Sequence, residues 1–158
     1  MSDYSDRDEL AVLERKVDEW LSAISDGTPQ IVAIDRGTAD DTSTGAARWY
    51  VRMRGEEKDV TTVWLTLGQR TMRYETYVMP APQENAEALY ENLLRRNDRL
   101  VGAHFSIGVE DAVFLRGELS NSLLSHAELD RVLGTLYATV EQTFQALLRI
   151  GFASRFAG

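Results

Sequence analysis

The residues that could carry out acid–base or metal chemistry in this chain are few and far apart. The sequence has two histidines, His104 and His126, and no cysteine. Neither histidine has a second histidine or a cysteine at the spacing of a zinc site, so we expect no metal and no cofactor. The phosphate-binding patterns Gly-x-x-x-x-Gly-Lys-Ser/Thr and Gly-x-Gly-x-x-Gly are absent, and no serine has the glycine-flanked setting of a hydrolase nucleophile. We therefore predict that the protein is not an enzyme.

Among the carboxylates, Glu75 is the best candidate for a functional group. It lies in an aromatic strand segment between Tyr74 and Tyr77. A buried carboxylate could act as an acid or base. The alternative, which we favour, is a cross-strand ion pair of Glu75 with Arg52 or Arg54.

Charge is distributed unevenly along the chain. The formal net charge is -8, which argues against nucleic acid as a partner because phosphate binding needs a basic surface. Residues 1–30 hold eight acidic and three basic residues, whereas residues 48–79 hold six basic and four acidic ones. Either an acidic helix covers a mildly basic sheet, or the sheet offers a basic patch to an anionic partner.

Length and end composition bound the kind of protein. At 158 residues the chain fits one domain with a core of its own, so we assign residues 1–158 to a single domain. The acidic, polar start is not a signal peptide, and no apolar run approaches the ~20 residues that cross a membrane. We expect a cytoplasmic protein with no membrane contact.

The first half of the chain predicts one helix followed by strands. Residues 5–26 carry an apolar stripe at helical spacing that includes Trp20. Apolar residues then alternate with Arg, Tyr, Trp, Thr and Glu, which is typical of an antiparallel sheet with one face on the core. The expected strands are residues 46–54, 60–67 and 71–79, with a further short candidate at residues 30–36. Residues 37–45 have the composition of a mobile, solvated loop.

The second half predicts a helix, a hairpin and a long helix. The first of these helices is expected over residues 84–97, with Asn97 as a C-terminal cap residue, and the hairpin strands over 101–109 and 112–119. Ser125 and Glu128 form a capping box, after which apolar residues including Phe144 repeat at helical spacing up to Gly151. We expect Phe144 to be buried where this helix crosses the sheet, and residues 153–158 to form a loosely held tail.

This order of elements predicts an α+β fold: one helix, three or four strands, a helix, two strands and a helix around an antiparallel sheet. Five short motifs between Arg48 and Phe152 also resemble those of the bacterial YbjN family, whose members are described as regulators of sensory transduction. They are residues 77–85, 94–97, 102–105, 128–130 and 150–152. The resemblance implies a fold similar to that of type III secretion chaperones, and it implies no catalytic residue.

A protein–protein interaction module, chaperone-like and regulatory, fits these features best. The face of the strands opposite the core carries aromatic and arginine residues, the types enriched in binding hot spots. We predict that the partner-binding residues are Tyr50, Trp64 and Tyr77 with Arg48, Arg52 and Arg73. The alternative is a small-ligand sensor with a pocket between the sheet and the long helix.

We also expect a homodimer, because the strands carry large aromatic residues on both faces. Trp64 would then lie at or near the dimer interface. The competing prediction is that the first helix, with Trp20, covers this face within one chain and leaves a monomer.

Overall fold

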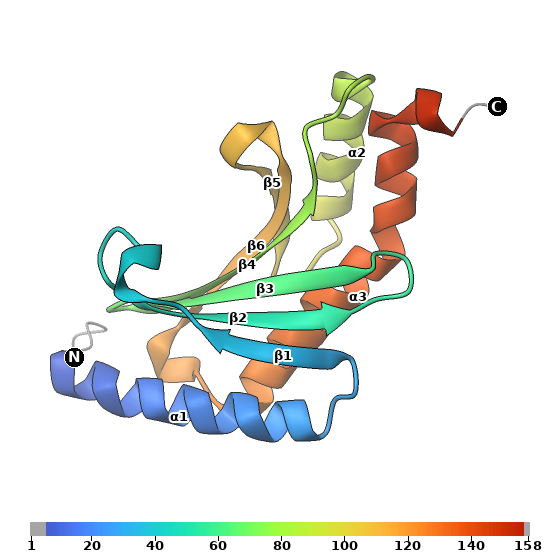
Figure 1. The fold of residues 1–158 in the computed structure, drawn as a ribbon. Helices are drawn as coiled ribbons and strands as arrows, with labels where there is room; N and C mark the ends of the chain where they lie inside the picture. The colour runs from blue at the N-terminus through green and yellow to red at the C-terminus, as the bar shows by residue number, and fades with distance from the viewer. Residues whose placement is uncertain (1–5, 157–158) are drawn as a thin grey trace.

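The chain forms a six-stranded antiparallel sheet with its long helices against one face (Figure 1). The structure is a computed structural model and describes residues 6–156. The helices are α1 (Arg7–Asp26), α2 (Ala86–Asn97) and α3 (His126–Gly151). The strands are β1 (Ile31–Arg36), β2 (Ala47–Arg54), β3 (Val60–Leu67), β4 (Thr71–Met79), β5 (His104–Ile107) and β6 (Val113–Ser120).

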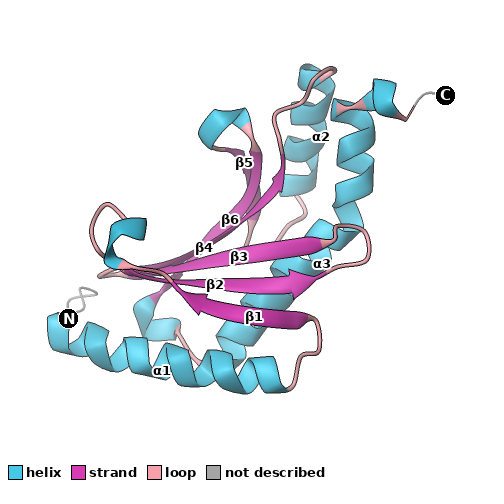
Figure 2. Ribbon diagram, in the orientation of Figure 1, coloured by secondary structure: helices cyan, strands magenta, loops and turns pink. Residues whose placement is uncertain are grey.

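Strand order in the sheet is β1-β2-β3-β4-β6-β5, so the short N-terminal strand joins the sheet at one edge. Four strands precede α2 and a hairpin precedes α3. Figure 2 draws the helices in cyan and the strands in magenta. The predicted α+β class and element order are therefore confirmed.

Helices α1 and α3 cover the same face of the sheet, which we call the inner face. The α1 helix begins at Asp6, whose side chain accepts a hydrogen bond of 2.8 Å from the Glu9 amide. Its position on the sheet is fixed by Trp49, whose indole Nε1 donates to Asp18 Oδ1 at 2.7 Å. Residue 5, the predicted helix start, lies outside the described residues.

Apolar side chains from β2, β3 and β4 form the floor of the core beneath α1 and α3. Inner-face residues such as Val51, Val63 and Leu65 are fully buried. The helices contribute Val17 and Leu21 from α1, together with a row of leucines and valines from α3. Burial of this apolar area is the main stabilisation of the fold.

The α3 helix begins as predicted at Ser125, whose hydroxyl accepts from the Glu128 amide at 3.1 Å. The return half of the capping box does not form, because the Glu128 carboxylate pairs with Arg131 at 2.7 Å instead. Phe144 is half-buried rather than buried. The expectation of a fully buried Phe144 is therefore wrong, because this residue lies at the border of the stripe, beyond the central row of the core.

The β5–β6 hairpin is shorter than its alternating sequence predicts. Strand β5 ends at Ile107, and Ile107 and Val109 are 50% and 71% exposed. The chain leaves the ladder at Gly108 and enters a 3-10 turn in which Glu110 has a left-handed φ of 58°. The strand predicted up to residue 109 is therefore too long.

The C-terminal end of α3 is held by the segment that follows β4. The amides of Gln83 and Glu84 both donate to the Gly151 carbonyl, at 2.9 and 3.1 Å. Asn85 Nδ2 donates to the Ile150 carbonyl at 3.0 Å. These bonds satisfy carbonyls that a helix end leaves unpaired. A side chain at Gly151 would come within 3.1 Å of Pro82, so glycine allows this close approach.

Asn97, the last residue of α2, binds the free edge of β5. Its Oδ1 accepts from the Phe105 amide at 2.7 Å and its Nδ2 donates to the Phe105 carbonyl at 3.1 Å. Its side chain therefore bonds to the backbone as a neighbouring strand would, and protects an edge strand from pairing. The predicted role of Asn97 as a helix cap is wrong.

Short turns occupy both segments that were predicted to be irregular. A 3-10 turn, Ala39–Asp41, lies within residues 37–45, with Thr38 and Asp41 bonded to each other. Another, Ala153–Arg155, follows α3. Residues 157–158 of the predicted tail lie outside the described part of the chain.

Candidate protein-binding surface

The sheet face opposite α1 and α3, which we call the outer face, brings together side chains from all six strands. Strand register places Tyr50 opposite Trp64, Trp64 opposite Glu75, and Glu75 opposite Arg116. On β2, β3 and β4 the outer face includes Arg48, Tyr50, Arg52, Thr62, Trp64, Thr66, Arg73, Glu75 and Tyr77. All six predicted binding residues therefore lie on one face.

Four aromatic rings form a continuous chain across this face. The Tyr50 and Trp64 centroids are 6.1 Å apart, those of Trp64 and Phe114 6.5 Å, and those of Phe114 and Tyr77 5.7 Å. Each pair has the edge-to-face geometry that stabilises aromatic contacts. Phe114 is buried, whereas Tyr77 is 39% exposed. The chain of rings is thus anchored by the buried Phe114 and reaches the surface at Tyr77.

Arginine side chains surround these rings. The Arg48 guanidinium lies over Trp64, 5.4 Å from the ring centroid, and its Nε donates to Thr66 Oγ1 at 2.9 Å. Arg52 is 3.6 Å from Asp35, with more than half of each side chain exposed. Such exposed pairs contribute little stability, so Arg52 is available to a partner.

Glu75 pairs with Arg116, not with Arg52 or Arg54, so the predicted ion-pair partners are wrong. Arg116 Nε lies 3.1 Å from Glu75 Oε1, and Arg73 Nε lies 3.5 Å from Oε2. The reason is topological: β4 lies between β3 and β6, whereas Arg52 and Arg54 lie two strands away. With two arginine partners and a nearly buried side chain, Glu75 has a structural role.

The turn around Asp41 borders the outer face. Tyr50 donates through its hydroxyl to Asp41 Oδ2 at 2.8 Å, and Arg48 Nη1 donates to the Asp41 carbonyl at 3.2 Å. The hydrogen bond from Tyr50, together with that from the Thr38 amide, lowers the pKa of the Asp41 carboxyl. Residues 37–45 are therefore tied to the sheet by two of the predicted binding residues.

Lys58, which the sequence did not single out, lies at the end of this face. Its Nζ donates to the Tyr77 carbonyl at 2.6 Å and lies over the rings of Tyr77 and Phe144, 5.1 and 5.6 Å from their centroids. Burial lowers the pKa of Lys58 to about 8. The sequence showed only that Lys58 lies in a charged turn. Such turns are normally solvated, so nothing in the sequence indicated that Lys58 is partly buried.

The turn that carries Lys58 is fixed by Glu141 of α3. The Glu141 carboxylate accepts from the amides of Glu56, Glu57 and Lys58 at 2.6, 2.8 and 3.3 Å. Desolvation raises the pKa of Glu141, but these three backbone hydrogen bonds outweigh it and leave that pKa lowered. The β2–β3 turn is thus held against α3 in one conformation.

A groove of about 640 Å³ crosses the outer face from β1 to the Lys58 turn. Tyr50, Trp64 and Tyr77 supply its aromatic wall, and Arg52 and Lys58 supply exposed or half-exposed positive charge. The remaining lining residues are Asp35, Arg36, Val60 and Thr62. Arg36 is neutralised by Glu14 and Asp18 of α1.

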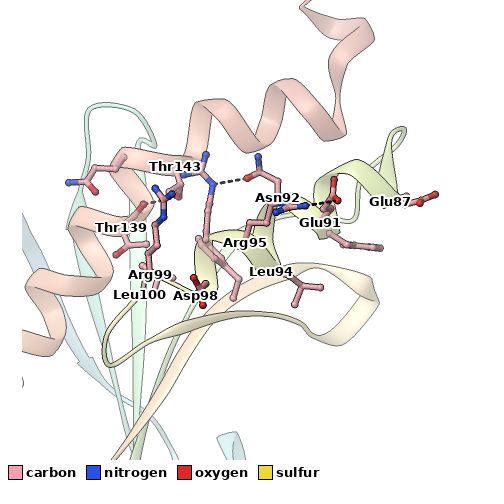
Figure 3. A pocket seen from close by; sticks show the side chains of 14 residues that line it. Glu87, Glu91, Asn92, Leu94, Arg95, Asp98, Arg99, Leu100, Thr139 and Thr143 are labelled. Atoms are coloured by element: carbon pink, nitrogen blue, oxygen red, sulfur yellow. Dashed lines mark hydrogen bonds and ion pairs between the residues drawn. The ribbon is translucent and has the colours of Figure 1, made fainter.

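A second, larger groove of about 1300 Å³ lies between α2 and α3 (Figure 3). It is lined by polar and charged side chains of α2, such as Arg95, by Thr139 and Thr143 of α3, and by Phe105 from the sheet. Within α2, Arg95 pairs with Glu91 at 3.2 Å. This groove is not the ligand pocket that the sequence predicted between the sheet and the long helix. That pocket would lie on the inner face, which is closed by packed apolar residues.

Both histidines are exposed, His104 on β5 and His126 in the first turn of α3. Within residues 6–156 no group of three or more His, Asp or Glu side chains is arranged to hold a metal ion. No helix in the same range is long and apolar enough to cross a membrane.

The first helix does not cover the outer face. Its Asp18 bonds to Trp49 on the inner face, and Val17 and Leu21 are buried in the core on that side. Trp64 is half-buried, with Arg48 stacked on it. The competing prediction was that α1, with Trp20, covers the outer face and leaves a monomer. The fold contradicts the first part of that prediction, because α1 lies on the inner face.

Curated proteins similar to this chain come from mycobacteria. The uncharacterized protein Rv0487 of Mycobacterium tuberculosis is 38% identical over 104 residues, which are 66% of this chain and 57% of that protein. The uncharacterized protein ML2442 of Mycobacterium leprae is 34% identical over 110 residues, 70% of this chain and 60% of that protein. The matches thus span no more than about three-fifths of these relatives.

Among solved structures, the chain is similar to one from the heterodimeric ExoU–SpcU complex of the type III secretion system of Pseudomonas aeruginosa. The TM-score is 0.49 at 12% identity, over 62% of this chain and 81% of that one. The family model that matches residues 33–149 is YbjN, described as "Putative bacterial sensory transduction regulator". The resemblance seen in the motifs is confirmed: the chain belongs to the YbjN family.

Proposed function

We propose that this protein is a non-enzymatic, chaperone-like regulatory module of the cytoplasm that binds another protein through the outer face of its sheet. The observation that carries the proposal is the cluster of half-exposed aromatic rings and arginines on a sheet whose inner face is closed. The family's description as regulators supports a role in interaction rather than in catalysis.

The outer face has the physical properties of a docking surface. Trp, Tyr and Arg are enriched in binding hot spots because they offer large contact areas with few rotatable bonds, or several hydrogen-bond donors. Here Trp64 is held by neighbouring rings and by Arg48 before any partner binds. Pre-ordering of contact side chains reduces the entropy cost of association.

We further propose that, when no other partner is bound, this face pairs with a second copy of the chain. A two-fold dimer would place the same patch of both subunits in contact, with Trp64 at its centre. Light scattering at micromolar concentration should then give twice the chain mass of 17.8 kDa. The variant Trp64→Arg should give the single-chain mass while keeping its circular dichroism.

The experiment that tests the docking face is affinity capture from the native cytosol with matched variants. We expect Trp64→Arg to lose a partner protein that the wild-type chain captures. Val101→Arg is the control, because Val101 is 82% exposed and lies in the loop before β5, outside the outer face. A partner retained by Trp64→Arg, or lost equally by Val101→Arg, would contradict the proposal.

A further inference from the structure

Lys58 is a partly buried cation that no carboxylate within the described residues neutralises. Its Nζ has one polar partner, the Tyr77 carbonyl at 2.6 Å, and otherwise faces the rings of Tyr77 and Phe144. An ammonium group has three donors. The Lys58 ammonium therefore retains hydrogen-bonding capacity on a surface groove.

Placing an ammonium group here costs stability. Burial disfavours the charged form, and no ion pair with Lys58 offsets this cost, so the pKa of Lys58 falls to about 8. The other lysine of the chain, Lys16, lies exposed on α1. A cation held in an unfavourable position within a groove is a feature of binding sites.

Besides Arg36, which α1 neutralises, the groove around Lys58 is lined by two cations, Arg52 and Lys58, and one carboxylate, Asp35, in a chain of net charge -8. Arg52 lines the same groove and has only the long, exposed contact with Asp35. On the same face lie Arg48 of β2 and Arg73 of β4, the second of which also contacts Glu75. Because α1 is on the inner face, its acidic residues do not cover these cations. The outer face is thus complementary in charge to an acidic partner.

We propose that the outer-face groove binds an extended, acidic segment of a protein partner, with an Asp or Glu side chain of that segment paired to Lys58. This inference rests on the proposed function and specifies the chemistry of the partner. The carboxylate would supply the charge that Lys58 lacks, and Arg52 would add a second donor group. The remainder of the segment would cover the rings of Tyr50, Trp64 and Tyr77. A free carboxylate that is not part of a peptide would gain the contact with Lys58 but would not cover the aromatic rings.

Affinity for such a segment should depend on pH in a defined direction. The free Lys58 titrates near pH 8, and a bound carboxylate raises that value, so binding is strongest below pH 8 and weakens as pH rises above it. Other titratable groups near Lys58 are Tyr77 on β4, Glu141 and Tyr137 on α3, and Glu56, Glu57 and Asp59 of its own turn. Burial raises the pKa of Tyr77 and of Tyr137, and the pKa of Glu141 is lowered, as described above.

The test uses lysine labelled with ¹³C at Cε, because two lysines give two assignable NMR signals. The probes are the blocked peptide Thr-Val-Thr-Glu-Thr-Val-Thr and its central-glutamine isostere, each at up to millimolar concentration. We expect the glutamate peptide to shift the Lys58 signal and to raise its titration midpoint. The Lys16 signal should not move. The glutamine peptide should bind roughly 10-fold more weakly, as expected for loss of a hydrogen bond to a charged group.

Variants of Lys58 sharpen this result. Lys58→Met should weaken the glutamate peptide about 10-fold without affecting the glutamine peptide, whereas Lys16→Met should change neither. Lys58→Arg should keep the affinity at about pH 9.5, because arginine stays charged there. Equal affinity for the two peptides, or no response of Lys58 to the glutamate peptide, would overturn the proposal.

Failure of this inference is distinguishable from failure of the proposed function. If Trp64→Arg loses the captured partner while Lys58→Met keeps it, the outer face is a docking surface and the carboxylate contact is rejected. If neither variant loses the partner, both the docking face and the carboxylate site are rejected.

Discussion

The two faces of this sheet are built from alternating residues of the same strands, yet they differ in packing. On β3, Leu65 is fully buried under the helices, whereas its neighbour Trp64 is half-buried on the open side. The inner face is packed with aliphatic residues, while the outer face is held by ring contacts, ion pairs and a cation over an indole. One face thus forms the core of the fold, and the other stays partly exposed to solvent.

The largest expected effect is the difference in unfolding free energy lost when two adjacent residues, one on each face, are replaced by alanine. Leu65→Ala should cost about 3 kcal/mol of unfolding free energy, because it leaves a cavity beneath α1 and α3. Trp64→Ala removes a larger side chain but should cost only about 1 kcal/mol, since that side chain is partly exposed and no helix layer packs over it. Urea denaturation of both variants measures the difference. Equal losses would mean that the outer face is also packed within the chain.

The alternation of polar and apolar residues was sufficient to predict the inner face and the element order. Helix α3, three of the strands before α2 and the α+β class were predicted from spacing, whereas β1 was only a candidate strand. Phe144 was predicted to be buried but lies at the border of the core, and the strand predicted up to residue 109 ends at the exposed Ile107. Periodicity assigns a side chain to a face but does not determine where the neighbouring layer ends.

The contacts of the outer face were harder to predict, because they depend on strand order. The partner of Glu75 follows from β4 lying between β3 and β6, which no local pattern reveals. Lys58 was missed because its burial comes from Tyr77 and from Phe144, far along the chain. The family motifs contain Asn85 and Asn97, which hold α3 and β5 in place. They therefore predict the fold better than the binding surface.

The second prediction concerns the ion pair that holds the centre of the outer face. Glu75→Gln should cost about 2 kcal/mol, because it leaves the half-buried Arg116 without its carboxylate. The loss is less than for a fully buried pair, since Arg116 Nη1 still donates to Ser106 Oγ at 2.9 Å. Adding Arg116→Met to Glu75→Gln should recover part of the loss. A double variant that is less stable than Glu75→Gln would contradict this account of the pair.

The third prediction is a gain in unfolding free energy rather than a loss, and it concerns Lys58. Its folded pKa of about 8 lies below the usual 10.5, so the unfolded chain binds more protons between these values and stability should rise with pH across that window. Below pH 8 the cost is present in full. Lys58→Met should therefore stabilise the fold at neutral pH by about 1 kcal/mol, after allowance for partial solvent screening.

The measurement for Lys58 is chemical denaturation at several pH values from neutral to about pH 10. The wild-type chain and the control Lys16→Met should gain stability above pH 8, whereas Lys58→Met should not. If Lys58→Met is less stable than the wild type at neutral pH, the ammonium is well accommodated, and the outer face does not hold an uncompensated charge.

The smallest expected effect tests the inner face at a single atom. Thr61 is fully buried there, and its Oγ1 has no hydrogen-bond partner among the described residues. Replacing an unpaired buried hydroxyl by a methyl group removes a desolvation cost without changing the shape, so Thr61→Val should stabilise the fold by about 0.5–1 kcal/mol.

Thr76 is the matched control, because it is equally buried but donates to the Thr62 carbonyl at 2.8 Å. Thr76→Val should be destabilising by a similar amount, and urea denaturation of the two variants should give shifts of opposite sign. Destabilisation by both substitutions would show that the Thr61 hydroxyl has a partner in solution and that the inner face is less uniformly apolar than its packing indicates.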